Sequence, residues 1–220
     1  MNSKKCPACG LVNFGMDEGC RRCQAPLGET GDGSPADAAP RQRSLARRLS
    51  WILGMTFTIL FICYASLLLT SDSPGLDQRQ ALRRAIALLD QKGFGREAFV
   101  LNHLVSFRTT DNWWNMQVGH HDAYAATNFP FEIVTLYPEF FDTATDDNER
   151  AVILLHESYH LFGSGERAAL EGVWRNKRRL DWTEDKYGQT KVWANTRDLT
   201  RSELPELFRC GEDEQSDCIQ

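Results

Sequence analysis

The sequence lacks any excess of basic residues. Its 220 residues include 25 Lys and Arg against 30 Asp and Glu, which gives a formal net charge of -5 at pH 7. A surface that binds nucleic acid needs concentrated Lys and Arg side chains to meet the phosphates. The composition therefore argues against nucleic acid as a partner. No internal repeat is visible in the chain either.

Charged residues are absent from one long segment, Leu49 to Ser71, which is rich in Leu, Ile and Phe. At ~1.5 Å per residue a helix of this length spans ~30 Å, the thickness of the hydrocarbon layer of a bilayer. A buried core helix usually keeps a polar stripe and is shorter. Residues 49–71 are therefore predicted to form a single transmembrane helix that contacts the lipid bilayer.

The flanks of this segment lack a signal-peptidase site. No small-x-small pattern follows it and nearly fifty residues precede it, which argues against a cleaved signal peptide. Lys and Arg concentrate on the cytoplasmic side of membrane proteins. We therefore expect a cytoplasmic N-terminus and an extracytoplasmic domain after Ser71. Four arginines lie directly before the segment, whereas Asp72 and Asp77 follow it and Arg79 comes slightly farther on. These four arginines are Arg41, Arg43, Arg47 and Arg48.

The chain divides into four predicted segments. Residues 1–27 form a Cys-rich head, and residues 28–48 form a flexible basic linker that begins with Gly, Pro, Ala and Ser. The transmembrane helix occupies residues 49–71. Residues 72–220 form the outer domain, for which the pattern predicts an α+β fold.

Helices dominate the outer domain. Apolar residues at helical spacing run from Leu76 to Leu89 and are followed by Gly93 and Gly95. Asp146 and Glu149 form a predicted capping pair for a helix that runs through Leu161 and stops at Gly163. A second helix is predicted from about Gly165 to Leu180. The run FEIVTLY, Phe131 to Tyr137, is bounded by prolines and predicts a strand.

The head contains two CxxC pairs, which are separated by ten residues and consist of Cys6, Cys9, Cys20 and Cys23. Two tight turns at this spacing can bring four thiolates around one Zn²⁺. Two disulfides or free thiols are the alternatives, but a reducing cytosol favours a metal. The sequences CPACGLVN and CRRC resemble zinc ribbons and Ran-binding-type zinc fingers, with Lys4 where those fingers usually have Trp. The resemblance implies one structural zinc and a module of a kind that binds a protein partner, nucleic acid or nothing known.

The outer domain contains the pattern HExxH, formed by His156, Glu157, Ser158, Tyr159 and His160. Residues four apart lie on one face of a helix, so both imidazoles can reach one metal ion. Glu157 is offset by one position and borders the same metal as a general base would. The surrounding helix is apolar nearly all round, and two histidines buried there need a shared partner. Two core histidines satisfied by ordinary hydrogen bonds are the alternative.

The segment HESYHLFGSGE resembles the zincin metallopeptidases, and Glu166-Arg167-Ala168-Ala169 is similar to the E-x-x-A helix start of gluzincins. No Met follows Met116, so the Met-turn of metzincins is missing. The resemblance implies a short zincin-like, gluzincin-like domain in which His156, His160 and Glu166 hold a catalytic zinc and Glu157 is the general base. Glu171 is an alternative third ligand, but Glu166 shares a helix face with Ala169, Leu170 and Val173.

Other residues are weaker candidates. In zincins a strand before the active-site helix binds substrate at its edge, and FEIVTLY occupies that order in the chain; ordinary sheet core is the alternative. His120, His121 and Tyr187 could polarise a scissile carbonyl, although surface or packing roles suit them as well. Cys210 and Cys218 form either a local disulfide or free thiols. Cys63 belongs to the membrane helix.

These patterns together predict a single-pass membrane protein with two zinc ions, one structural and one catalytic. Its outer domain is expected to be a metallopeptidase that hydrolyses bonds in peptide or protein substrates. The alternative from another class is a non-catalytic, membrane-tethered binding or sensing protein, in which the HExxH segment is a metal-stabilised scaffold.

Overall fold

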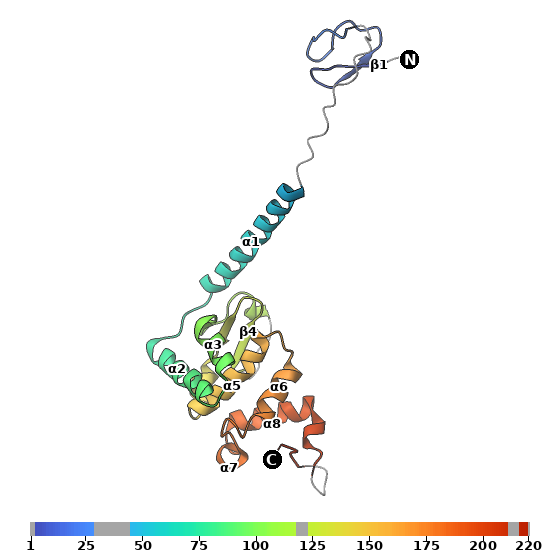
Figure 1. The fold of residues 1–220 in the computed structure, drawn as a ribbon. Coiled ribbons are helices and arrows are strands. Elements are labelled where there is room, and N and C mark those ends of the chain that lie inside the picture. The colour runs from blue at the N-terminus through green and yellow to red at the C-terminus, as the bar shows by residue number, and fades with distance from the viewer. Residues whose placement is uncertain (1–2, 29–44, 118–122, 211–215, 220) are drawn as a thin grey trace. The chain divides into compact units, whose positions relative to one another are not determined.

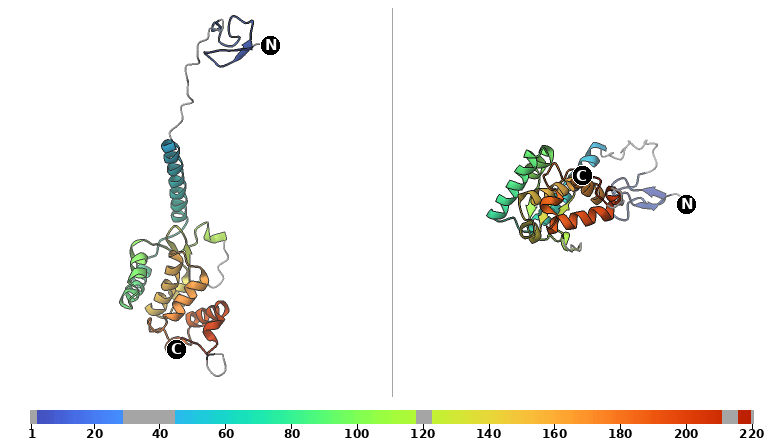
Figure 2. Two further views of the ribbon diagram at one scale, coloured as in Figure 1. Left: turned by 45° about the vertical axis from the view of Figure 1, so that its right-hand side comes forward. Right: turned by 90° about the horizontal axis from the view of Figure 1, so that it is seen from below.

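A computed structural model describes residues 3–28, 45–117, 123–210 and 216–219. The chain forms two compact units, Met1–Met55 and Thr56–Gln220, which are treated separately below. Figures 1 and 2 show the elements of each. The α+β class expected for the outer domain is confirmed, since a small sheet is combined with several helices.

The N-terminal unit contains two similar turns, one in each CxxC pair. Strands β1 (Ser3–Lys5) and β2 (Val12–Phe14) pair antiparallel and flank the first turn. The Gly10 N–H donates to the Cys6 carbonyl, and the Gln24 N–H donates to the Cys20 carbonyl in the same way. Gly10 and Gln24, the fourth residues after these cysteines, both adopt positive φ, +75° and +58°. Both turns therefore have the same backbone geometry.

Asn13 connects these two turns. Its buried side chain donates to the Leu11 carbonyl at 2.9 Å and accepts the Arg21 N–H at 3.1 Å. An amide that bonds to both turns holds them at a fixed separation, which a cluster of four sulfur atoms requires.

Helix α1 (Leu45–Leu69) contains the apolar segment, and it is long and apolar enough to span a membrane. It begins four residues before the predicted start at Leu49 and ends two before Ser71. Most of its side chains are exposed, but Leu67 and Ser71, at and just beyond its C-terminal end, are buried against the rest of the second unit. The first part of the predicted linker, residues 29–44, lies outside the described residues.

The second unit continues with two helices, α2 (Leu76–Gln91) and α3 (Gly95–His103). A three-stranded sheet follows in the order β3-β5-β4, from β3 (Ser106–Arg108), β4 (Ala125–Asn128) and β5 (Ile133–Leu136). Strand β5 runs parallel to β3 and antiparallel to β4. A 3-10 turn, η1 (Asn115–Gln117), lies between β3 and β4.

The predicted strand is shorter than the pattern suggested and occupies the centre of the sheet. Only the four residues of β5, from the seven of FEIVTLY, pair in the sheet, and all four are buried. Both edges of β5 are already hydrogen-bonded, so the expected edge pairing with substrate is wrong for this strand. The alternative of ordinary sheet core is correct, and β4 forms the edge.

The remaining elements are helical: α4 (Pro138–Asp142), α5 (Asp147–Leu161), α6 (Glu166–Arg175), α7 (Glu184–Tyr187), α8 (Lys191–Glu203) and the 3-10 turn η2 (Pro205–Phe208). Helix α5 packs against α2, α3, α6 and β4 (Figure 1). Helix α6 ends at Arg175, and tight turns rather than regular helix continue to Leu180.

At the N-terminus of α5, only the Asp146 half of the predicted capping pair forms. The Asp146 carboxylate accepts the N–H groups of Asn148 and Glu149, which satisfies two free donors of the first turn. Glu149, however, does not bond back to Asp146. Its fully buried carboxylate accepts from the Thr145 N–H at 2.8 Å and from the hydroxyl of Thr190, the N-cap of α8. The prediction is therefore confirmed for Asp146 as the N-cap and wrong for Glu149 as its partner.

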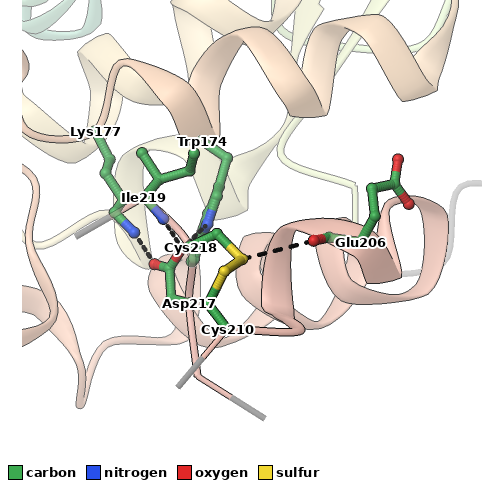
Figure 3. The surroundings of a disulfide bond; sticks show 7 residues. All are labelled: Trp174, Lys177, Glu206, Cys210, Asp217, Cys218 and Ile219. Carbon is green, nitrogen blue, oxygen red and sulfur yellow. Dashed lines mark hydrogen bonds and ion pairs between the residues drawn. A yellow bond between two sulfur atoms is a disulfide. The ribbon is translucent and has the colours of Figure 1, made fainter. Parts of the chain in front are cut away.

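Three tryptophans form the core beneath α6 and α8. Trp174, Trp182 and Trp193 are at most 1% exposed, and the ring centroids of Trp182 and Trp193 lie 4.6 Å apart. Cys210 and Cys218 form a disulfide beside this core (Figure 3), so the alternative of free thiols is wrong.

Asp217, next to that disulfide, holds two buried donors. Its carboxylate accepts the Trp174 indole N–H at 3.1 Å and pairs with the Lys177 ammonium (Figure 3). The Lys177 side chain is only 6% exposed. A buried ammonium without its counter-charge is costly, so the C-terminal segment stabilises the core through this carboxylate.

We predict that Asp217→Ala lowers the free energy of unfolding by ~3–5 kcal/mol, because it leaves Lys177 buried and unpaired. Urea unfolding followed by tryptophan fluorescence measures this, since Trp174 lies in the same core. Lys186→Ala is the matched control. It removes an ion pair with Asp181 whose side chains are both more than half exposed, and it should cost less than ~1 kcal/mol. Equal effects of the two substitutions would contradict the prediction.

Candidate metal centres

The four N-terminal cysteines form one cluster that could bind zinc. The Cys6 and Cys23 sulfurs lie 3.5 Å apart, the Cys9 and Cys20 sulfurs lie 3.4 Å apart, and all four lie within 4.8 Å of one another. Tetrahedral zinc with Zn–S bonds of ~2.3 Å places its sulfurs about 3.8 Å apart. The donor set and its spacing therefore fit a structural zinc ion.

The backbone around this cluster favours a thiolate at Cys20. The N–H groups of Arg22 and then Cys23 lower the pKa of the Cys20 thiol to about 6. A thiolate is the form that binds a metal ion, so the turn geometry prepares this ligand in advance. Cys6 and Cys20 are only 2% exposed.

The HExxH residues lie in the last turns of α5 and meet the first residue of α6. The Nε2 atoms of His156 and His160 are 3.1 Å apart, and Glu166 carboxylate oxygens lie 3.3 Å and 3.2 Å from them. Donor atoms around tetrahedral zinc, at bond lengths of ~2.0–2.1 Å, lie about 3.3 Å apart. The structure thus brings the three predicted ligands together at a spacing that could hold one metal ion.

Local sequence explains how Glu166 returns to the histidines. Gly163 adopts φ +79° after the last turn of α5, a conformation that glycine tolerates and other residues rarely adopt. Helix α6 then approaches α5 closely at Gly172, where an added Cβ would lie 2.4 Å from the Tyr159 ring. These two glycines direct the chain back and bring the start of α6 alongside the end of α5.

His160 is oriented by the same turn. Its Nδ1 lies 2.9 Å from the Ser164 carbonyl, to which an N–H on that atom donates, and this leaves Nε2 toward His156 and Glu166. A backbone carbonyl that fixes the outer nitrogen is the usual support for a metal-binding imidazole. The Glu166 carboxylate raises the pKa of His160 to about 9, and the histidines hold the pKa of Glu166 well below its usual range.

Glu171, the alternative third ligand, points elsewhere. Its carboxylate accepts the Arg175 guanidinium N–H at 2.7 Å on the solvent side of α6. The buried residues of α6 are Ala169, Leu170, Val173 and Trp174. The structure thus brings Glu166, and not Glu171, beside the two imidazoles.

Glu157 lies beside the three donors in the wall of a cleft of about 920 Å³. It is only 5% exposed, and its Oε2 accepts a hydrogen bond from the Thr127 hydroxyl at 2.6 Å. The cleft is bordered by β4, α5, α6 and α8. A carboxylate held on a cleft wall by one hydrogen bond keeps its second oxygen free to accept a proton.

The cleft walls formed by β4 and α8 were not predicted from the sequence. Thr127 on β4 bonds to Glu157, and Tyr124 accepts a hydrogen bond from the Asn195 amide of α8 at 3.0 Å. Thr127, Tyr124 and Asn195 all line the cleft. The short run AATN gives no strong strand pattern, so only the pairing with β5 identifies β4 as the sheet edge here.

Tyr187, another predicted candidate, is not among the residues that line this cleft. The Tyr187 hydroxyl donates to Asp146 at 2.7 Å, at the N-terminus of α5, so the suggestion that it polarises a substrate carbonyl is wrong. His120 and His121 lie outside the described residues. Cys63 is a free cysteine in α1, as expected.

Comparisons of this chain with protein-family models, with curated proteins and with solved structures found no match.

We predict that the metal-replete chain binds two zinc ions and that Cys9→Ser with Cys23→Ser removes one of them, because two remaining thiolates cannot hold zinc tightly. Elemental analysis after desalting gives the stoichiometry. Cys63→Ser is the control and should keep both ions. A stoichiometry of one in the unsubstituted chain would mean that one of the two clusters holds no metal.

We predict that Glu166→Ala weakens zinc binding at the α5 cluster by at least ~100-fold, because it removes one of three protein ligands. Glu171→Ala, on the same helix, is the matched control and should leave the affinity unchanged. Competition with a chelator measures both. Loss of zinc in Glu171→Ala but not in Glu166→Ala would reverse the assignment.

Proposed function

We propose that the chain is a membrane-anchored zinc metallopeptidase with a small zincin-like domain of the gluzincin type. The observation that supports it most is the meeting of three features at one cleft. A His156–His160–Glu166 donor set, the buried carboxylate of Glu157 and the edge strand β4 border the same space. Each feature alone is common, but together they supply a metal site, a general base and a binding edge for a peptide.

Zinc bound by the three donors would polarise a scissile carbonyl and lower the pKa of a water molecule toward ~7. Glu157 has the position of the general base: it follows His156 directly in α5 and lines the cleft. It takes the proton from the attacking water and delivers it to the leaving amine. Thr127 holds the carboxylate in place through its hydroxyl.

Strand β4 supports a polypeptide as the substrate. Among the described residues β4 pairs with β5 alone, so its other edge has unpaired backbone groups along the cleft. An extended peptide can add to such an edge through main-chain hydrogen bonds. The cleft also has apolar walls at Val152, Leu170 and Leu199, which suit side chains of a bound peptide.

We include in this proposal the membrane topology predicted from the arginines that precede the uncharged segment. The four-cysteine head is cytoplasmic and carries one structural zinc, α1 crosses the bilayer, and the metallopeptidase domain is extracytoplasmic. The head would then recruit a protein partner on the cytoplasmic side.

We predict that Glu157→Gln lowers turnover by at least ~100-fold while zinc stays bound, because an amide keeps the size of the side chain but accepts no proton. Cleavage of a broad peptide library by the zinc-loaded chain, with and without chelator, measures activity. Glu171→Gln is the matched control and should keep full activity. Equal loss of zinc and activity in Glu157→Gln would make Glu157 a structural residue. A zinc-loaded chain that cleaves no peptide would favour the non-catalytic binding or sensing protein.

A further inference from the structure

The loop before η1 and η1 itself display large apolar side chains on the surface of the second unit. Trp113, Trp114 and Met116 are 40%, 51% and 74% exposed, and the two indole rings lie 5.7 Å apart. We call these three residues the aromatic surface. Exposed aromatic clusters of this kind usually mark a contact with another molecule or a membrane.

The loop is held rigidly, so its exposed rings are not the product of a loose segment. Asn112, Asn115 and Asn128 are buried and bonded to one another: Asn112 donates to Asn128 at 2.8 Å, and Asn128 donates to Asn115 at 2.6 Å. The Asn112 side-chain Oδ1 also accepts the Trp114 N–H at 3.0 Å. This network fastens the loop to the end of β4.

The same loop is bonded to the C-terminal end of α1. The Trp113 indole N–H donates to the Ser66 hydroxyl at 3.0 Å, and the Trp113 backbone N–H lies 3.4 Å from the Thr70 hydroxyl. Further bonds join the end of α1 and its extension to the segment before the loop: Tyr64 to Ser106, and Asp72 to Thr109 and Thr110.

These bonds fix the position of the aromatic surface along the axis of α1, and therefore its depth in a membrane that α1 crosses. Ser66 lies five residues before Ser71, the end of the uncharged run, and so about 8 Å inside that end at ~1.5 Å per residue. The headgroup region of a bilayer extends roughly 5–8 Å beyond each side of the hydrocarbon core. A hydrocarbon core of ~30 Å that begins at Leu49 ends about 5 Å beyond Ser66, so Trp113 lies just inside the boundary between hydrocarbon and headgroups.

We infer that the aromatic surface lies in the outer lipid interface and holds the second unit against the bilayer. Tryptophan favours this boundary because its ring is apolar and its N–H is polar. The inference rests on the membrane span in the proposed function and not on peptidase activity. The aromatic surface is also connected to the cleft. Phe129 directly follows Asn128, which bonds to the loop, and it lines the cleft and is 58% exposed.

Tryptophan fluorescence in vesicles tests the inference on the full chain. Trp174, Trp182 and Trp193 are at most 1% exposed and supply a constant background. Three variants each keep one further tryptophan, Trp51, Trp113 or Trp114, with Phe at the other two positions. Each is reconstituted in phosphatidylcholine vesicles whose acyl chains carry bromine close to the headgroup or close to the chain end.

Trp113 and Trp114 should each lose about half or more of their own fluorescence to the shallow bromines, and less to the deep ones. Trp51, in the predicted span, should be quenched as well. The variant with Phe at all three positions should show no quenching. Lys191→Trp in that background is the position control. It places an exposed indole on α8, away from the end of α1 in Figures 1 and 2, and should not be quenched.

Quenching of Trp51 without quenching of Trp113 or Trp114 would overturn the inference and leave the membrane span intact. Absence of quenching at all three positions would contradict the span and the inference together. Quenching of Lys191→Trp equal to that of Trp113 would mean unspecific adsorption and would also overturn it.

Discussion

The burial of α5 is the constraint on which the second unit depends. A helix that is enclosed on nearly every side cannot leave a polar side chain without a partner, because an unpaired buried charge or amide costs several kcal/mol. The polar residues of α5 therefore bond to neighbouring elements. Glu149 accepts from Thr190 at the start of α8, and Glu157 accepts from Thr127 on β4.

The C-terminal end of α5 follows the same rule. His156 and His160 are satisfied by Glu166 at the start of α6 and, for His160, by the Ser164 carbonyl. Helix α6, helix α8 and strand β4 are thus each attached to α5 by a polar contact, and these are the elements that border the cleft. The polar residues that suit the cleft for chemistry are also those that assemble it.

The sequence was informative where a signal is local. The two CxxC pairs, the uncharged helix and the Asp146 cap all depend on residues a few positions apart, and the helical phase of Glu166 follows from one helix. It was not informative where two bonded residues or strands lie far apart in the sequence. Glu149 bonds to Thr190, and β5 is central because β3 and β4 pair with its two edges, which no pattern within FEIVTLY records. Strand β4 illustrates the same limit, since its four residues have no strong periodicity, yet Thr127 contacts Glu157 and Asn128 holds the loop of the aromatic surface.

The sulfur atoms of this chain require two different chemical environments. Cys6, Cys9, Cys20 and Cys23 can bind a metal ion only as reduced thiolates, whereas Cys210 and Cys218 are joined as an oxidised disulfide. Glutathione and thioredoxin keep the first state, and oxidising compartments keep the second. In the proposed topology α1 lies between the two groups of cysteines, so each group faces the redox condition that favours its state.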